Sequence, residues 1–113
     1  MKTPERVAEE QRWLRAQYGS MFDNIAALLF KHDPLGINFE DNTDEYESEA
    51  RTILPRLRQC HSVEDALRSV HEEFVRWFTP EVAGPQERYA QIASEIWGLW
   101  QAYLAERDKK LGE

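Results

Sequence analysis

The chain has 113 residues, of which 42% are hydrophobic and 31% charged, and its formal net charge is -7 at pH 7. This composition excludes a disordered tail and is typical of one globular domain over residues 1–113. The negative field would repel phosphate backbones, so nucleic acid is not an expected partner. The sequence holds no run of about 20 apolar residues and no apolar leader, so we expect no membrane association and a cytoplasmic protein.

The first predicted element is a long helix over residues 3–32, because apolar residues recur there at helical spacing after a Thr-Pro start. Gly19 lies inside this segment, and glycine costs about 1 kcal/mol relative to alanine in a helix interior. We therefore expect a bend at Gly19, or two nearly collinear helices that meet there. The helix should end at Asp33, because a residue that precedes proline is pushed out of the helical region.

An acidic loop over residues 32–42 follows, and we expect it to be ordered. Gly36 should take a positive φ just after the corner at Pro34. Three apolar side chains should pack onto the bundle rather than face water: Leu35, Ile37 and Phe39. Thr43 fits the N-cap of the next helix. The first turn of that helix would then place Asp44, Glu45 and Glu47 near the positive end of the helix dipole.

Three more helices are predicted after this loop, which makes about four in an all-α, single-domain bundle. The second carries Pro55 in its interior, so it should kink or split there at a cost on the order of 3 kcal/mol. The third begins with a capping box at Ser62 and ends before Pro80. After a short turn, the fourth covers residues 86–107, and the tail over residues 106–113 should fray.

The sequence offers no complete catalytic or metal-binding pattern, so no catalytic residue, metal ligand or cofactor is assigned. Cys60 is the only cysteine, which rules out an internal disulfide and a zinc site built from several thiolates. An EF-hand pattern fails at nearly every ligand position of the acidic loop. The helical nucleotide pyrophosphohydrolases use a Glu-Glu-x-x-Glu set, and neither Glu9-Glu10 nor Glu72-Glu73 is completed in that way.

The residues Asp33-Pro34-Leu35-Gly36-Ile37, followed by Asp44-Glu45-Tyr46, resemble the signature of a family of small bacterial all-helical proteins of unknown function. The resemblance implies an all-α fold and a bacterial origin, and it carries over no activity. We assign a structural role to five residues of this motif: Asp33, Pro34, Gly36, Asp44 and Tyr46. They should form a helix-loop-helix corner, in which an aspartate caps the next helix and Tyr46 packs into the core.

The acidic stretch also leads to the function that we expect from the sequence, a non-enzymatic protein-binding module. Four carboxylates are assigned to contact a basic protein partner: Glu40, Asp41, Glu45 and Glu49. In size and charge the chain also resembles the immunity proteins that inhibit bacterial toxins.

Two alternatives stay open. The first is a metal-dependent hydrolase with carboxylate ligands inside the helical bundle. The second is a homodimer that associates through a Trp-rich face made of Trp13, Trp97, Trp100 and Tyr103, because Trp and Tyr often dominate interface energy.

Overall fold

The computed structural model describes residues 3–36 and 46–111, and within them all regular structure is helical. In chain order the elements are α1 (Pro4–Tyr18), α2 (Met21–His32), α3 (Glu47–Ile53), the 3-10 helix η1 (Leu54–Gln59), α4 (Val63–Trp77), α5 (Pro80–Ala83), the 3-10 helix η2 (Gln86–Tyr89) and α6 (Ala90–Leu111). The all-α prediction is confirmed. The expected number of about four helices is too low, since the described residues form six α-helices and two 3-10 helices.

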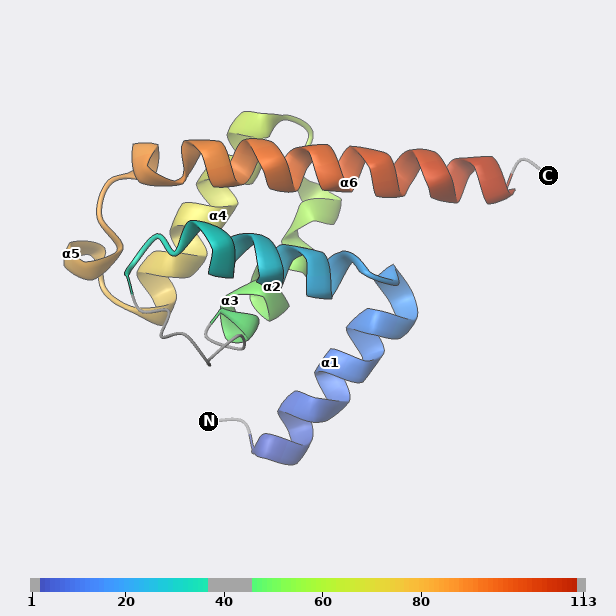
Figure 1. Ribbon diagram of the computed structural model, residues 1–113, viewed down its shortest axis with the longest axis horizontal. Coiled ribbons are helices and arrows are strands. Elements are labelled where there is room, and N and C mark those ends of the chain that lie inside the picture. Colours follow the sequence, from blue (N-terminus) through green and yellow to red (C-terminus); the bar gives the residue numbers. More distant parts are fainter. Residues whose placement is uncertain (1–2, 37–45, 112–113) are drawn as a thin grey trace.

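The body of the molecule is formed by α2, α3, α4 and α6 (Figure 1). α2 and α6 run side by side, α4 packs against α6, and α3 packs against both α2 and α4. α1 turns away from the far end of α2, while the last turns of α6 extend past the corner between α1 and α2. The body therefore carries the core, and α1 and the end of α6 project from it.

The core fills the space between these helices with large apolar and aromatic side chains. Those that are fully buried are Phe22, Ile25, Leu29, Tyr46, Ile53, Leu54, Leu57, Val70, Phe74, Tyr89 and Ile96. The ring centroid of Phe74 lies 4.8 Å from that of Tyr89 and 6.1 Å from that of Tyr46. Because aromatic side chains bury large apolar areas, Tyr46 ties the start of α3 to α4 through Phe74, and Phe74 ties α4 to η2 through Tyr89.

Gly19 separates α1 from α2 completely, so the expected bent helix or nearly collinear pair is not formed. Gly19 has φ 62° and ψ -128°, its N–H donates to the Arg15 carbonyl at 2.9 Å, and the chain then turns sharply (Figure 1). A positive φ costs most L residues about 1–2 kcal/mol, and glycine avoids this cost. Within α1 the buried side chains are Leu14 and Tyr18, so the apolar packing of this helix is concentrated near the corner.

Two helix boundaries follow directly from proline and from a capping hydroxyl. Pro55 splits the predicted second helix, because α3 ends at Ile53 and η1 takes over one residue before the proline. The turn predicted after the third helix contains the short helix α5. Its N-cap is Thr79, whose hydroxyl accepts from the Val82 N–H at 3.1 Å.

α6 is the longest described helix, with 22 residues. α6 extends to Leu111, and fraying of residues 106–113 stays a prediction. Its first half packs into the core through Ile92, Ile96 and Trp100, whereas residues 105–110 are exposed. Over the ranges 3–36 and 46–111, no helix combines the length and the apolar character that crossing a bilayer requires.

Candidate functional site

The acidic loop leaves α2 through a tight turn that begins at Asp33. Asp33 has φ 46° and ψ 59°, a left-handed conformation that aspartate tolerates better than most residues. Its N–H donates to the Leu29 carbonyl at 2.8 Å, and its own carbonyl accepts from the Gly36 N–H at 3.0 Å. Pro34 occupies the second position of this turn, and Gly36 has the expected positive φ, 65°. The Asp-Pro-Leu-Gly sequence therefore ends α2 and turns the chain away from its axis.

Tyr46 joins the turn after α2 to the residue that precedes α3. Its hydroxyl donates to Asp33 Oδ1 at 2.6 Å and accepts from the Leu35 N–H at 3.3 Å. Its ring is fully buried against Phe74. A hydrogen bond to an ionised carboxylate is stronger than one between neutral groups. These hydrogen bonds therefore tie the turn after α2 to the start of α3, and we call the three residues Asp33, Leu35 and Tyr46 the Tyr46 clamp.

The structure describes only one of the four residues that were predicted to bind a partner. Three of them, Glu40, Asp41 and Glu45, lie outside the described residues, as does Asp44 of the structural motif. Glu49 is described, and it does not face outward as we expected, because its side chain is only 4% exposed. The cause is helical spacing, since Tyr46, Ala50 and Ile53 share the face of α3 that packs into the core and Glu49 lies on that face.

Polar contacts join α1 to α3 directly after the acidic loop. The Arg51 side chain is 6% exposed, and its Nη1 lies 2.7 Å from Glu10 Oε2. Its guanidinium carbon also lies 5.7 Å from the centre of the Trp77 ring, within the range of a cation–π contact. Gln11 Nε2 donates to Glu47 Oε1 at 3.4 Å. These contacts therefore tie α1 to the start of α3.

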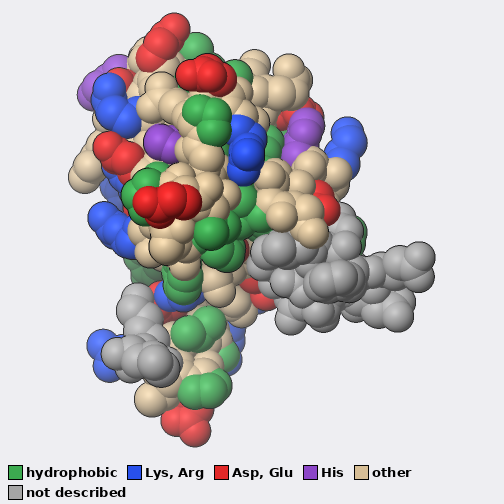
Figure 2. All heavy atoms as spheres, turned by 90° about the vertical axis from the view of Figure 1, so that its left-hand side faces the viewer, with side chains coloured by type: hydrophobic (Ala, Val, Ile, Leu, Met, Phe, Trp, Pro, Cys, Tyr) green, Lys and Arg blue, Asp and Glu red, His purple; other side chains and the backbone are tan. Residues whose placement is uncertain are grey.

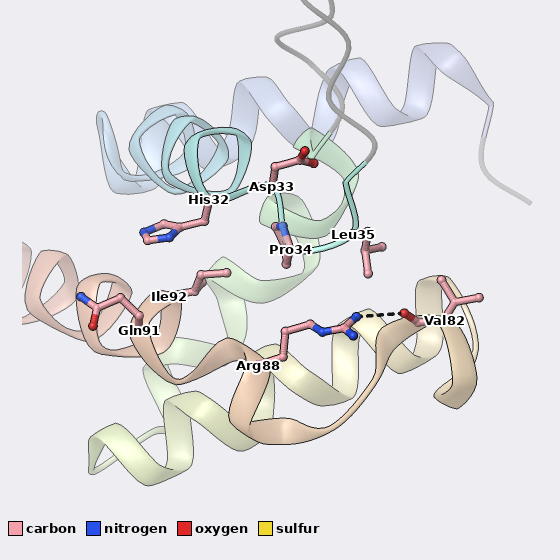
Figure 3. Close-up of a pocket in the computed structure, with 8 residues that line it drawn as sticks. All are labelled: His32, Asp33, Pro34, Leu35, Val82, Arg88, Gln91 and Ile92. Atoms are coloured by element: carbon pink, nitrogen blue, oxygen red, sulfur yellow. Dashed lines mark hydrogen bonds between the residues drawn. The ribbon is translucent and has the colours of Figure 1, made fainter.

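A hollow of about 480 Å³ lies beside the Tyr46 clamp, between the end of α2 and the segment from α5 to α6 (Figure 3). It is lined by His32, Asp33, Pro34, Leu35, Val82, Arg88, Gln91 and Ile92. Figure 2 faces this end of the molecule and shows acidic and basic side chains intermixed with apolar ones. Sequence reasoning missed His32, Arg88 and Gln91 as site residues, because no spacing pattern links residues that lie so far apart in the chain.

His32 and Glu95 form a pair near this hollow and join α2 to α6. His32 Nε2 and Glu95 Oε2 are 2.5 Å apart. This hydrogen bond is the main cause that lowers the pKa of the Glu95 carboxyl below its ordinary value, while burial opposes it and Gln91 assists it. A carboxyl whose pKa is lowered by folding stabilises the folded state above its unfolded pKa. That contribution is lost as the pH falls through the folded pKa.

We therefore expect Glu95→Gln to be less stable than the wild-type chain near pH 6, with a difference that shrinks below about pH 4. Urea midpoints at a series of pH values measure this difference. Glu106→Gln, at an exposed position of α6, is the matched control and should track the wild-type chain throughout. A Glu95→Gln difference that stays constant from pH 6 to low pH would contradict the role given to this pair.

Metal ligation finds no support among residues 3–36 and 46–111, where no three His, Cys, Asp or Glu side chains gather around a common point. Cys60 is buried, and its thiol donates to the Arg56 carbonyl at 3.4 Å. The chain matches no protein-family model, and neither a curated protein nor a solved structure matches it. The resemblance to the small bacterial helical family therefore remains a prediction.

Proposed function

We propose that this chain is a non-enzymatic protein-binding module that uses the acidic loop to bind a basic protein partner. Residues 37–45 contain no lysine or arginine and four carboxylates, which are Glu40, Asp41, Asp44 and Glu45. The observation that supports the proposal most strongly is the Tyr46 clamp, because it anchors the chain on both sides of this segment. A loop that is held at both ends has less conformational freedom to lose on binding than a free chain.

The charge distribution favours a basic partner. Residues 1–50 carry eleven acids and five bases, whereas residues 51–113 carry ten acids and nine bases. Such an asymmetry speeds encounter with a positively charged surface and makes binding sensitive to salt. The form of this function that we favour is an immunity-type inhibitor of a basic toxin, by analogy of size and charge.

Two buried charged residues, Arg51 and Glu73, form ion pairs between helices, which supports a binding role over a catalytic one. Glu73 pairs with Arg56 at 2.9 Å, and Glu10 pairs with Arg51 at 2.7 Å. A catalytic carboxyl requires a shifted pKa together with access to substrate. These carboxylates instead neutralise arginines at contacts between helices, so no contact of the described residues favours the metal-dependent alternative.

The homodimer alternative depends on the Trp-rich face, and the core takes up much of that face. Trp100 is 3% exposed, and its ring centroid lies 6.1 Å from that of Tyr18 and 5.2 Å from that of Tyr103. Trp13 is 52% exposed. Self-association through this face would therefore rest mainly on Trp13 and on the half-buried Trp97.

Affinity capture from the native host tests the proposed function. We expect the wild-type chain to retain a basic protein at about 0.1 M salt and to release it at about 0.5 M salt. The loop variant Glu40→Lys/Asp41→Lys/Glu45→Lys should lose this partner. The matched variant Glu9→Lys/Glu106→Lys/Asp108→Lys changes the net charge equally at exposed positions outside the loop, and it should retain the partner.

Two results would count against the proposal. The first is a captured protein that is neutral or acidic, because the acidic loop would have no complementary surface to bind. The second is an equal loss of the partner in both variants. That result would assign the binding to net charge rather than to the loop.

A further inference from the structure

Arg88 carries a guanidinium group that the preceding turn holds in one place. Its Nη1 donates to the Val82 carbonyl at 3.3 Å and to the Ala83 carbonyl at 3.1 Å. A Cβ atom added at Gly84 would lie 2.7 Å from Arg88 Cζ and 2.9 Å from both Nη atoms, so the group packs directly against the glycine. Gly84 also has φ 78°, a conformation that residues with side chains rarely adopt.

The carbonyl groups of this turn are themselves fixed. The buried Tyr89 hydroxyl donates to the Ala83 carbonyl at 2.5 Å. His71 Nε2 lies 2.9 Å from the Gly84 carbonyl oxygen and must be the donor, because a carbonyl can only accept. The guanidinium of Arg88 is therefore positioned before any ligand arrives, which lowers the entropy cost of binding.

Arg88 differs from the other positioned arginines because it has no carboxylate partner within the described chain. Those that do form an ion pair with an aspartate or glutamate are Arg15, Arg51, Arg56, Arg68 and Arg76. Both main-chain hydrogen bonds of Arg88 use Nη1, which leaves the edge formed by Nε and Nη2 without an acidic partner in this part of the molecule. That edge presents two N–H groups in the geometry that suits the two oxygens of a carboxylate.

The hollow beside Arg88 combines this charge with other polar groups and several apolar side chains. Its volume of about 480 Å³ falls within the range of small-molecule sites, roughly 300–1,000 Å³. The apolar lining consists of Pro34, Leu35, Val82 and Ile92. Asp33 also lines the hollow, but it accepts a hydrogen bond from Tyr46, and Figure 3 shows its carboxylate turned away from Arg88. His32 is paired with Glu95, so Arg88 supplies the uncompensated charge.

We propose that this hollow binds a small organic carboxylate, whose oxygens pair with Arg88 and whose apolar body packs against Leu35, Val82 and Ile92. A carboxylate suits the site better than a phosphate group, because one arginine in an acidic chain compensates a single negative charge. Residues 32–35 at the start of the acidic loop line the hollow, but this proposal rests on Arg88 and on apolar side chains rather than on the loop carboxylates, so neither proposal depends on the other.

The test uses the full chain, with hexanoate as the probe and hexanamide as its neutral analogue. We expect hexanoate to shift the Ile92 methyl resonances in NMR spectra in a saturable way. Hexanamide should bind at least about tenfold more weakly, because it cannot form the charge-assisted pair. Equal affinity for the two probes, or hexanoate shifts that are spread over the surface without saturation, would overturn the proposal.

Two matched pairs of variants locate the binding. Arg88→Gln should weaken hexanoate binding about tenfold or more, whereas Arg58→Gln, at an exposed arginine of η1, should leave it unchanged. Val82→Asp should also weaken binding, because it places a negative charge in the lining, and Val82→Asn is its neutral control. Val82 is 52% exposed, so this second pair decides the question even if Arg88→Gln does not fold. Unchanged affinity in Val82→Asp, or in a folded Arg88→Gln, would refute the site.

Discussion

Replacement of Arg56 by methionine should lower the free energy of unfolding by about 3 kcal/mol, because it leaves a buried carboxylate poorly compensated. Glu73 of α4 is 1% exposed, and its Oε2 lies 2.9 Å from Arg56 Nη1. Arg56 Nη2 pairs with Glu72 as well, and this hydrogen bond is the main cause that lowers the pKa of Glu72. Without Arg56, Glu73 would keep Arg76, which lies 3.6 Å away and is 75% exposed. Urea unfolding of the wild-type and variant chains measures the loss.

A double variant separates the broken charge pair from a general effect of losing the Arg56 side chain. Arg56→Met with Glu73→Leu removes both charges, so it should be closer in stability to the wild-type chain than Arg56→Met alone. Arg58 lies at an exposed position of η1, the helix that also contains Arg56. Arg58→Met should change the free energy of unfolding by less than about 0.5 kcal/mol. If the double variant were less stable than Arg56→Met, the structural role of the pair would be refuted.

Tyr46→Phe should lower the free energy of unfolding by about 2 kcal/mol. The substitution keeps the ring that packs against Phe74 and removes only the hydroxyl of the Tyr46 clamp. Asp33 then loses its 2.6 Å donor, and the Leu35 N–H loses its acceptor. Hydrogen bonds to charged groups contribute about 1.5–3 kcal/mol, so their loss at a part-buried position should be readily measured by urea unfolding.

Tyr103→Phe is the matched control for this substitution. The Tyr103 hydroxyl donates to the Gln17 carbonyl at 3.1 Å in an exposed position, so its removal should cost less than about 1 kcal/mol. A Tyr46→Phe variant that loses no more stability than Tyr103→Phe would show that the clamp does not hold the base of the loop.

The local features around Asp33 could be predicted from the sequence because they follow from backbone chemistry alone. Proline excludes the preceding residue from a helix, and glycine supplies a positive φ at little cost. The end of α2 and the conformation of Gly36 follow from these two rules. The same holds for the start of α4, where the Ser62 hydroxyl accepts from the Asp65 N–H at 3.2 Å.

The direction of α1 and the environment of Glu49 could not be predicted, because both depend on tertiary packing. Gly19 indicates that the helix is interrupted at this residue, but it does not give the angle between the helices on either side. Glu49 is a charged residue in an acidic stretch, which normally indicates solvent, yet its register on α3 places it on the buried face beside Tyr46. Whether a charged side chain is buried depends on contacts between helices, and a local sequence pattern does not predict these contacts.

The hollow at Arg88 could not be predicted from the sequence either. It brings together the end of α2 and the segment from α5 to α6, and no motif spans that separation. The one local signal was Gly84, which lies between Pro80 and Pro85. This pattern indicates a tight turn, but it does not predict that the turn fixes the guanidinium of Arg88.

The central claim is that the acidic loop binds a basic protein, and the salt dependence of the dissociation constant tests it most directly. For the captured partner and the wild-type chain, we expect the dissociation constant to rise steeply between about 0.05 M and about 0.5 M salt. The Glu40→Lys/Asp41→Lys/Glu45→Lys variant should bind at least about tenfold more weakly at low salt and show a flatter dependence, while the Glu9→Lys/Glu106→Lys/Asp108→Lys variant should behave like the wild-type chain. Identical affinity and salt dependence in the loop variant and the wild-type chain would contradict the claim.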